Sequence, residues 1–162
     1  MHNLRIVPFH KKYSSTFYHL NKIWIEEFFL LEESDKFDLL DPEKSIINKG
    51  GEIFFVLIEN KPIATAAMIP IKSDTYELAK MTVDAKYRGN GIANKLMDKC
   101  ILFAEEKEAK EIILITNDTL VIARNLYDKY GFKEVPLDSD KYLRGNVKMT
   151  LNLVKDKITM DK

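Results

Sequence analysis

The sequence contains a single cysteine, Cys100, and no run of hydrophobic residues long enough to cross a membrane. One cysteine cannot form an intrachain disulfide or supply a metal site made of several thiolates, so a reducing compartment is the simplest expectation. Residues 1–5 also lack the apolar run of a signal peptide. These absences predict a cytoplasmic location and no membrane partner.

Neither sign of charge is in excess, because 25 basic residues balance 25 acidic ones. Proteins that bind nucleic acids usually carry a basic excess that neutralises phosphates, so no nucleic-acid partner is expected. The histidines are His2, His10 and His19, which lie near the N-terminus without forming a metal-ligand cluster. We therefore expect no metal.

The length of 162 residues and the 46% hydrophobic content are typical of one domain spanning residues 1–162, with a frayed tail over about 155–162. Alternating and continuous apolar runs predict strands over residues 4–8, 53–58, 63–69, 76–83, 112–115, 132–135 and 147–154. Short turns join the strands at 53–58, 63–69 and 76–83, whereas a helix precedes 112–115. The pattern predicts an α/β (α+β) fold with a mixed, mostly antiparallel sheet of about six to seven strands and about four helices.

The N-terminal third contains an aromatic stripe followed by an acidic segment. Apolar residues recur at helical spacing at Tyr13, Phe17, Leu20, Trp24 and Phe28, which predicts a helix with a buried aromatic face. Residues 26–41 then mix hydrophobic residues with Asp and Glu, and Asp41-Pro42 is typical of the start of a short helix. Taken alone, the acidic residues are expected to belong to a solvated loop.

Glycine is scarce, with six residues, yet two of them fall in one turn between the strand at 76–83 and a helix. The helix begins after Gly91, and its apolar line includes Ile92, Leu96, Cys100 and Phe103, so Cys100 is expected to be a packed core thiol. The turn consists of Arg88, Gly89, Asn90, Gly91, Ile92 and Ala93. Unpaired N–H groups at a helix start bind phosphates, so this turn is either a pyrophosphate site or an ordinary loop with glycines.

Two separated motifs favour the phosphate interpretation. Arg88, Gly91 and Ala93 fit the pattern Arg/Gln-x-x-Gly-x-Gly/Ala, which resembles the acetyl-CoA-binding motif of the GNAT superfamily of N-acetyltransferases. A second GNAT element, Ala-x-x-Leu-Tyr-x-x-x-Gly-Phe, is matched by Ala123, Leu126, Tyr127, Gly131 and Phe132. The resemblance covers residues 52–135 and implies the GNAT fold, with acetyl-CoA as cosubstrate.

The resemblance also implies which further residues contact the coenzyme. Backbone groups of Met81, Thr82 and Val83 would bind the pantetheine arm, and the Met81 N–H would face the thioester oxygen. Many members have an asparagine for pantetheine where this chain has Leu120. Asn117 or Asn125 is expected to take that role.

Two catalytic residues follow from the same resemblance. Tyr127 matches the tyrosine beside the coenzyme sulfur, which makes it a general acid or a packing residue. Glu77 lies where several members carry a general base, although it is also expected as a strand-end carboxylate paired with Lys80 or Lys110. Because strand side chains alternate, Glu77 is expected to share a face with Ala79, Met81 and Val83.

The implied function is transfer of the acetyl group of acetyl-CoA to a primary amine of a small molecule, by direct attack in a ternary complex. The alternatives are acetylation of a protein amine and a coenzyme-binding sensor without turnover. A homodimer is left open. The residues that would select the acceptor lie in the first fifty residues and in residues 138–145. The resemblance also implies that the acidic residues within 26–41 lie over the acceptor site, where they would favour a cationic amine as the alternative to a solvated loop.

Overall fold

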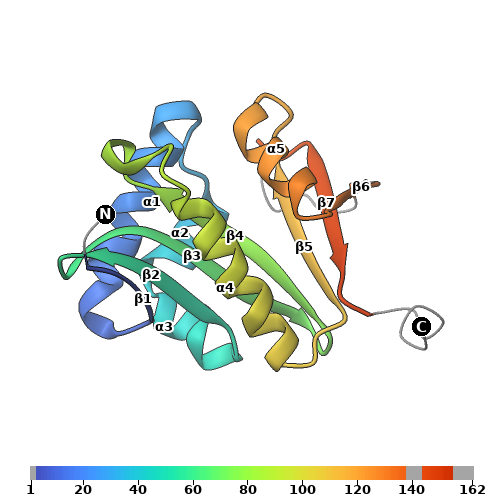
Figure 1. The fold of residues 1–162 in the computed structure, drawn as a ribbon, viewed down its shortest axis with the longest axis horizontal. Coiled ribbons are helices and arrows are strands. Elements are labelled where there is room, and N and C mark those ends of the chain that lie inside the picture. The colour runs from blue at the N-terminus through green and yellow to red at the C-terminus, as the bar shows by residue number, and fades with distance from the viewer. Residues whose placement is uncertain (1–2, 138–143, 155–162) are drawn as a thin grey trace.

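The computed structural model describes residues 3–137 and 144–154, and these form one mixed sheet with helices on both faces (Figure 1). The tail over 155–162 and most of the polar loop before β7 lie outside the described residues. The helices are α1 (Ser14–Phe28), α2 (Glu33–Leu40), α3 (Pro42–Ser45), α4 (Ile92–Glu106) and α5 (Val121–Lys129). The expected helices are therefore present, and α2 is an addition to them.

The sheet has seven strands in the order β1-β2-β3-β4-β5-β7-β6. The strands are β1 (Leu4–Pro8), β2 (Glu52–Ile58), β3 (Lys61–Lys72), β4 (Thr75–Val83), β5 (Glu111–Thr116), β6 (Lys133–Val135) and β7 (Val147–Asn152). Only β4 and β5 pair in parallel, because α4 connects them as a crossover, and the other neighbours are antiparallel. This confirms the predicted mixed, mostly antiparallel sheet.

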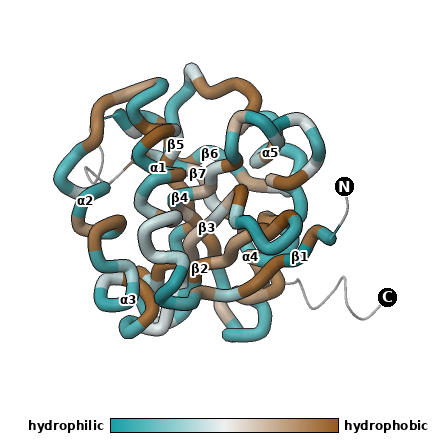
Figure 2. The backbone as a smooth tube through the Cα atoms, turned by 90° about the vertical axis from the view of Figure 1, so that its left-hand side faces the viewer, coloured by the Kyte–Doolittle hydropathy of each residue, from teal (hydrophilic) through white to brown (hydrophobic). Residues whose placement is uncertain are grey.

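Two hydrophobic cores cover the two faces of the sheet. Figure 2 shows α1 and α4 on opposite sides of the strands. The first core lies under α4, where Ile92, Leu96 and Cys100 pack against β2 to β5. The second lies under α1 and α2, where Phe17, Ile25 and Leu39 pack on β2 and β3. The central strands are buried on both faces, as their continuous apolar sequences predict.

Cys100 is buried in the first core, as predicted. Burial raises the pKa of its thiol far above the ordinary value, since the thiolate would lose its hydration there. A buried thiol of this kind is unreactive.

The acidic segment folds differently from the expected solvated loop. Asp41 does cap α3, because its carboxylate accepts a hydrogen bond from the Lys44 N–H at 3.3 Å. The preceding residues, however, form α2, which begins with a reciprocal capping box between Glu32 and Asp35. Asp35 and Asp38 are buried, so the loop interpretation is wrong for both.

Strand β4 contains a bulge that changes which face its side chains occupy. Thr65 of β3 pairs with Thr82, but Ala67 pairs with Ala79, so two β4 residues stand opposite one β3 residue. Lys80 in the bulge has a φ of +56°, a left-handed conformation that costs a non-glycine residue about 1–2 kcal/mol.

The bulge overturns the expected common face of Glu77, Ala79, Met81 and Val83. Ala79 packs in the core under α1, whereas Met81 and Val83 pack against the core under α4. The extra residue in β4 shifts the alternation by one position. Such a bulge cannot be read from a sequence with ordinary strand residues.

Candidate active site

A cleft of about 830 Å³ opens where β4 and β5 diverge. Pairing between these strands is limited to Thr75, Tyr76 and Glu77 on β4, so residues 78–83 have no strand partner on the β5 side. Residues of α1, the start of α4, the end of β5 and α5 complete the walls. Twelve predicted site residues line this cleft: Glu77, Met81, Thr82, Val83, Arg88, Gly89, Gly91, Ile92, Ala93, Asn117, Asn125 and Tyr127.

Asn90 is the predicted site residue that does not line the cleft. Its side-chain amide donates to the carbonyls of Tyr87 and Arg88 at 3.1 and 3.3 Å. These bonds stabilise the turn before α4, so its side chain shapes the turn.

The start of α4 has the properties of an anion site. Gly91 is the N-cap with a φ of +76°, and it offers no side chain to the first N–H groups of the helix. The first turn contains no acidic residue. A Cβ at Gly89 or Gly91 would meet no atom within 4 Å, so the space above the turn is open to a ligand. Unpaired N–H groups and the helix dipole would stabilise a phosphate there.

Arg88 is held at the edge of this turn. Its Nε donates to the Val83 carbonyl at 3.1 Å, and its Nη2 contacts Glu27 of α1 at 3.3 Å. The two side chains are 36% and 44% exposed, and an ion pair of that exposure contributes about 0–1 kcal/mol. A phosphate can therefore replace Glu27 at little cost.

We expect Gly91→Val to abolish measurable acetyl-CoA binding in calorimetric titration, because a branched side chain would occupy the space that a phosphate needs. Gly50→Val is the matched control, since Gly50 also has a positive φ (+95°) and open space around it but does not line the cleft. Both variants should lose similar stability from backbone strain. Equal acetyl-CoA affinity in the two variants would contradict a phosphate site at this turn.

Tyr127 lies half-buried on α5 at the cleft wall, with its ring edge-on to Phe132 at a centroid distance of 6.0 Å. Burial raises the pKa of its phenol to about 12. The phenol therefore keeps its proton throughout the physiological range and can donate a hydrogen bond into the cleft.

Glu77 is the last β4 residue that pairs with β5, and its side chain lies at the point where the cleft begins. It is 2% exposed. Of the two lysines considered as its partners, Lys80 bonds to Asp35 at 2.7 Å and Lys110 lies 4.0 Å from Asp74. Glu77 is a buried residue that lines the cleft.

Leu120 lines the cleft at the N-cap of α5, so the missing asparagine is a real departure at this wall. The side chain of Asn117 already has two protein partners: its Nδ2 donates to the Arg144 carbonyl at 2.6 Å, and its Oδ1 accepts from the Thr119 N–H at 2.9 Å. It precedes α5 without capping it. Asn125 is exposed on α5 and lines the cleft, which makes it the better candidate for a pantetheine contact.

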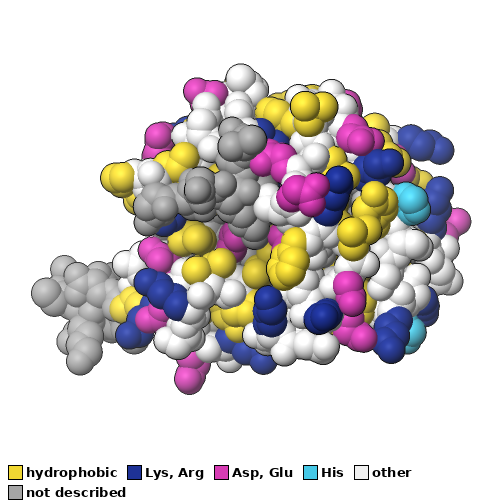
Figure 3. Space-filling view, turned by 180° about the vertical axis from the view of Figure 1, so that it is seen from behind, with side chains coloured by type: hydrophobic (Ala, Val, Ile, Leu, Met, Phe, Trp, Pro, Cys, Tyr) yellow, Lys and Arg dark blue, Asp and Glu magenta, His cyan; other side chains and the backbone are white. Residues whose placement is uncertain are grey.

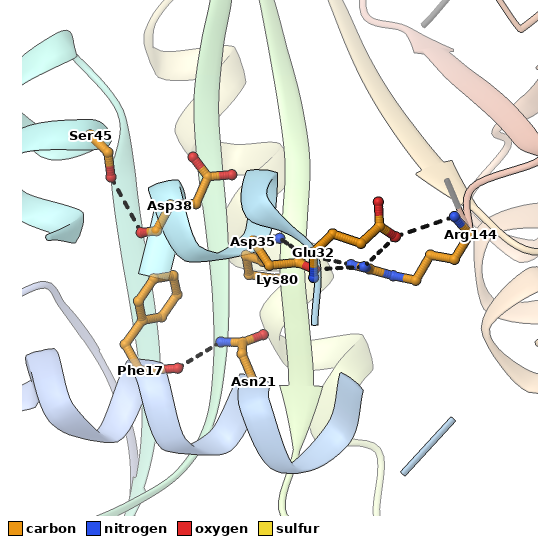
Figure 4. Close-up of polar contacts among 8 residues, drawn as sticks. All are labelled: Phe17, Asn21, Glu32, Asp35, Asp38, Ser45, Lys80 and Arg144. Carbon is orange, nitrogen blue, oxygen red and sulfur yellow. Dashed lines mark hydrogen bonds and ion pairs between the residues drawn. The ribbon is translucent and has the colours of Figure 1, made fainter. Parts of the chain in front are cut away.

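Four charged residues form a buried cluster beside the cleft (Figure 4). This charge cluster consists of Glu32, Asp35, Lys80 and Arg144. Arg144 donates to both oxygens of Asp35 at 2.7 Å, and its Nη1 also reaches Glu32 at 3.0 Å. Lys80 donates to Asp35 at 2.7 Å. The side chain of Asp35 is fully buried, and Lys80 is only 3% exposed.

The charge cluster fixes the ionisation of Asp35. Burial alone would raise the pKa of this carboxyl, but the hydrogen bond from Arg144 and the charge of Lys80 outweigh burial and lower the pKa to about 2. Asp35 is thus a carboxylate whose charge is met by two cations. Because Lys80 and Arg144 already neutralise Asp35, this carboxylate does not favour a cationic ligand, although the acidic sequence around it had suggested one.

The lowered pKa predicts an acid-dependent loss of stability. In the pH range from about 4 down to about 2, the unfolded chain binds a proton at Asp35 and the folded chain does not, so stability falls as pH falls. The contribution of this carboxylate is roughly 2 kcal/mol, present above pH 4 and lost below pH 2. Urea unfolding at several pH values should show this loss, and it should be absent in Asp35→Asn.

Other cleft residues escaped the sequence analysis. Trp24 and Phe28 of α1, with Phe29 just after the helix, line the cleft, although the stripe that contains Trp24 and Phe28 was expected to be wholly core. Phe17 is the one member of that stripe that is fully buried, and Phe28 is 47% exposed. The other buried residues of α1 are Asn21 and Ile25, which lie outside the stripe. The stripe serves both the core and the cleft.

Lys129 is a second cation near the start of α4. Its Nζ bonds to the Asn94 side chain at 3.0 Å, and both residues line the cleft. Pairs of this kind have no local sequence signal, because they join two helices.

The outer face over α1 to α3 mixes both signs of charge with exposed hydrophobic side chains (Figure 3). In residues 3–137 and 144–154, no group of His, Cys, Asp and Glu is arranged to hold a metal. Within the same ranges, no helix combines the length and the hydropathy needed for a membrane span.

Comparison with known proteins agrees with this architecture. The model of the acetyltransferase (GNAT) family matches residues 17–132. The chain is 33% identical to N-acetylaspartate synthetase of Xenopus tropicalis over 121 residues, which are 74% of this chain and 44% of that protein. It is 31% identical to human N-acetyltransferase 8B over 103 residues, 60% of this chain and 45% of that protein. The chain thus spans less than half the length of these relatives.

Solved structures show the same fold. A GNAT-family acetyltransferase from Staphylococcus aureus superposes with a TM-score of 0.85 at 24% identity, covering 93% of this chain and 99% of the other. The PaiA N-acetyltransferase of Thermoplasma acidophilum, solved in complex with coenzyme A, superposes with a TM-score of 0.76 at 14% identity, covering 93% of this chain and 99% of the other. The family model, the two motifs and the cleft between the diverging strands lead to one conclusion: the chain belongs to the GNAT family of acetyltransferases.

Proposed function

We propose that this chain transfers the acetyl group of acetyl-CoA to a primary amine of a small molecule, by direct attack within a ternary complex. The observation that carries the proposal is that the start of α4, Glu77 and Tyr127 line the same cleft. Membership of the GNAT family supports acetyl-CoA as cosubstrate. No metal and no covalent intermediate is needed for this chemistry.

The coenzyme would bind along two elements. The first N–H groups of α4 and the Arg88 guanidinium would bind the pyrophosphate. Backbone groups of residues 81–83 would bind the pantetheine arm as an added strand, because β4 has no partner on this side. Asn125 would contribute a side-chain amide from the opposite wall.

The transfer step needs a base, an oxyanion donor and an acid. Glu77 would accept a proton from the acceptor amine, directly or through water, so that the nitrogen lone pair can attack the thioester carbon. The Met81 N–H would donate to the carbonyl oxygen as it gains negative charge. When the carbon–sulfur bond breaks, Tyr127 would give its proton to the thiolate. The second proton of the attacking nitrogen would then return to the Tyr127 oxygen, directly or through water, and the acetyl group remains on nitrogen as a neutral amide.

The raised pKa of Tyr127 makes it a weak acid, so its ability to protonate the thiolate depends on the pKa of the coenzyme thiol. A free thiol has a pKa of about 8.5. Burial raises thiol and phenol pKa values in the same direction, as it does for Cys100. A thiolate leaving inside the cleft is therefore more basic than one in water, which reduces the energetic cost of the proton transfer.

A small amine is the preferred acceptor because of the relatives' names. N-acetylaspartate synthetase is named for an acetylated amino acid. A panel of free amino acids, polyamines and arylalkylamines, with an N-terminal peptide as the protein-like arm, should be screened for thiol release from acetyl-CoA. Release with a small amine supports the proposal. Release with the peptide alone indicates a protein acceptor, and binding of acetyl-CoA without release indicates a sensor.

We expect Glu77→Gln to lower kcat most at low pH and to recover partly at high pH, where more of the amine is already neutral. Glu59→Gln, on the exposed β2–β3 turn, is the control and should follow the unmodified profile. The measurement is the pH dependence of kcat with one good acceptor. A pH-independent loss would assign Glu77 a structural role and leave water as the base.

A further inference from the structure

The bulge in β4 lies directly beside the atoms that would bind the thioester. Lys80 adopts the left-handed conformation, and Met81 follows it. Both line the cleft. In a bulge the extra residue leaves the regular ladder, so the bulge decides which backbone amides of β4 face the cleft. The position of the Met81 N–H therefore depends on how firmly the bulge is held.

A non-glycine residue persists in this conformation only when its surroundings over-determine it. Lys80 is fixed at the far end of its side chain by the 2.7 Å bond to Asp35, and this pair is almost completely buried. Asp35 is itself fixed by two 2.7 Å bonds from Arg144 and by the Glu32 N–H at 2.9 Å. A carboxylate with four donors cannot rotate away.

The elements joined here are distant in sequence. Asp35 lies 45 residues from Lys80 and 109 residues from Arg144. Through one carboxylate, helix α2 is tied to the β4 bulge and to the chain just before β7 (Figure 4). Asp35 and Glu32 do not line the cleft, whereas Lys80 and Arg144 do.

We infer that the Asp35–Lys80 ion pair is a positioning device for the transfer step: it holds the β4 bulge so that the Met81 N–H meets the acetyl carbonyl oxygen. Asp35 acts through Lys80 and touches no substrate. The inference rests on the proposed use of this cleft for acetyl-CoA, but not on turnover.

The test compares two neutralised pairs. In Asp35→Asn/Lys80→Met both charges are removed together, so neither is left buried alone. In the control, Asp74→Asn/Lys110→Met, the pair is exposed and lies at 4.0 Å. For each protein, the Met81 amide resonance is recorded with saturating coenzyme A and with saturating acetyl-CoA, and kcat is measured with the best acceptor.

The unmodified protein and the control should show a Met81 amide shift that differs between acetyl-CoA and coenzyme A. The Asp35→Asn/Lys80→Met protein should bind acetyl-CoA with a Kd within about threefold of the unmodified value, because the anion site is intact, but it should lose that difference. Its kcat should fall by about 10²-fold, the effect of a misplacement of about 1 Å. A purely structural pair would change the melting temperature and leave both the resonance and kcat unaltered.

Two results would overturn the inference: a Met81 response in the double variant equal to that of the unmodified protein, or no Met81 response in the unmodified protein. If the double variant does not fold, Asp35→Glu provides the same test, because it keeps the charge and displaces the carboxylate by one methylene. An unchanged Met81 response in Asp35→Glu would then overturn it. Absence of turnover with every amine, together with a normal Met81 response, rejects the proposed function and retains the positioning role.

Discussion

Tyr127→Phe is expected to lower kcat by about 10²- to 10⁴-fold while the Kd for acetyl-CoA and the melting temperature barely change. The substitution keeps the ring and its contact with Phe132 and removes only the hydroxyl. Because the pKa of this phenol is about 12, the hydroxyl is protonated at every pH used for assay. Steady-state kinetics with one acceptor, combined with calorimetry, measures both quantities.

Tyr130→Phe is the matched control for this variant. Tyr130 lies three residues further on, and its hydroxyl bonds to the Asn94 carbonyl at 3.1 Å and to Asp98 at 2.7 Å, which links α5 to α4. Loss of the Tyr130 hydroxyl should lower the free energy of unfolding by about 1 kcal/mol and leave kcat nearly unchanged. If Tyr127→Phe also left kcat within a few-fold of the unmodified protein, Tyr127 would be a packing residue, and another group would protonate the sulfur.

Asp35→Ala is expected to destabilise the fold by about 3–5 kcal/mol, because it removes the common carboxylate from the buried Lys80 and the partly buried Arg144. Urea unfolding measures the free energy, with attention to any change in m-value. Asp74→Ala removes an exposed partner of Lys110 and should cost no more than about 1 kcal/mol. A loss below about 1 kcal/mol for Asp35→Ala would show that the charge cluster contributes little to the fold.

Local sequence patterns predict the helix after the glycine turn and the two motifs best. The apolar line through Ile92, Leu96 and Cys100 predicts α4 and its buried face, and the structure confirms both. The glycine turn and the second motif point to the two ends of one cleft. Each motif lies within about ten consecutive residues, so a single sequence is sufficient to identify it.

The part that sequence does not provide concerns pairs of residues from distant segments. Asp35 meets Arg144 across 109 residues, and nothing in the local sequence of either predicts the contact. The acidic composition of α2 suggested a solvated loop or a surface for a cationic ligand, and gave no sign of the two cations that bind Asp35. The Lys80 bulge was missed for a related reason, since it depends on the register between β3 and β4.

The aromatic stripe shows a third kind of limit. Helical spacing identifies one face of α1 but cannot tell whether that face meets a strand or a cavity. Phe17 packs in the core, whereas Trp24 and Phe28 line the cleft that opens where β4 and β5 diverge. The divergence depends on how β4 pairs with β5, and the helical spacing in α1 carries no information about that pairing.

The central claim is direct acetyl transfer to an amine within this cleft, and an acetyl balance in one quenched reaction tests it most directly. Unmodified protein, acetyl-CoA and the best acceptor are mixed and quenched, and mass spectrometry quantifies the N-acetylamine and the intact protein while a dye quantifies free thiol. Direct transfer predicts equal amounts of thiol and N-acetylamine, with no acetyl group on the protein. Acetyl-CoA that binds yet stays intact with every amine, or an acetyl group found on the protein before the amine is acetylated, would contradict it.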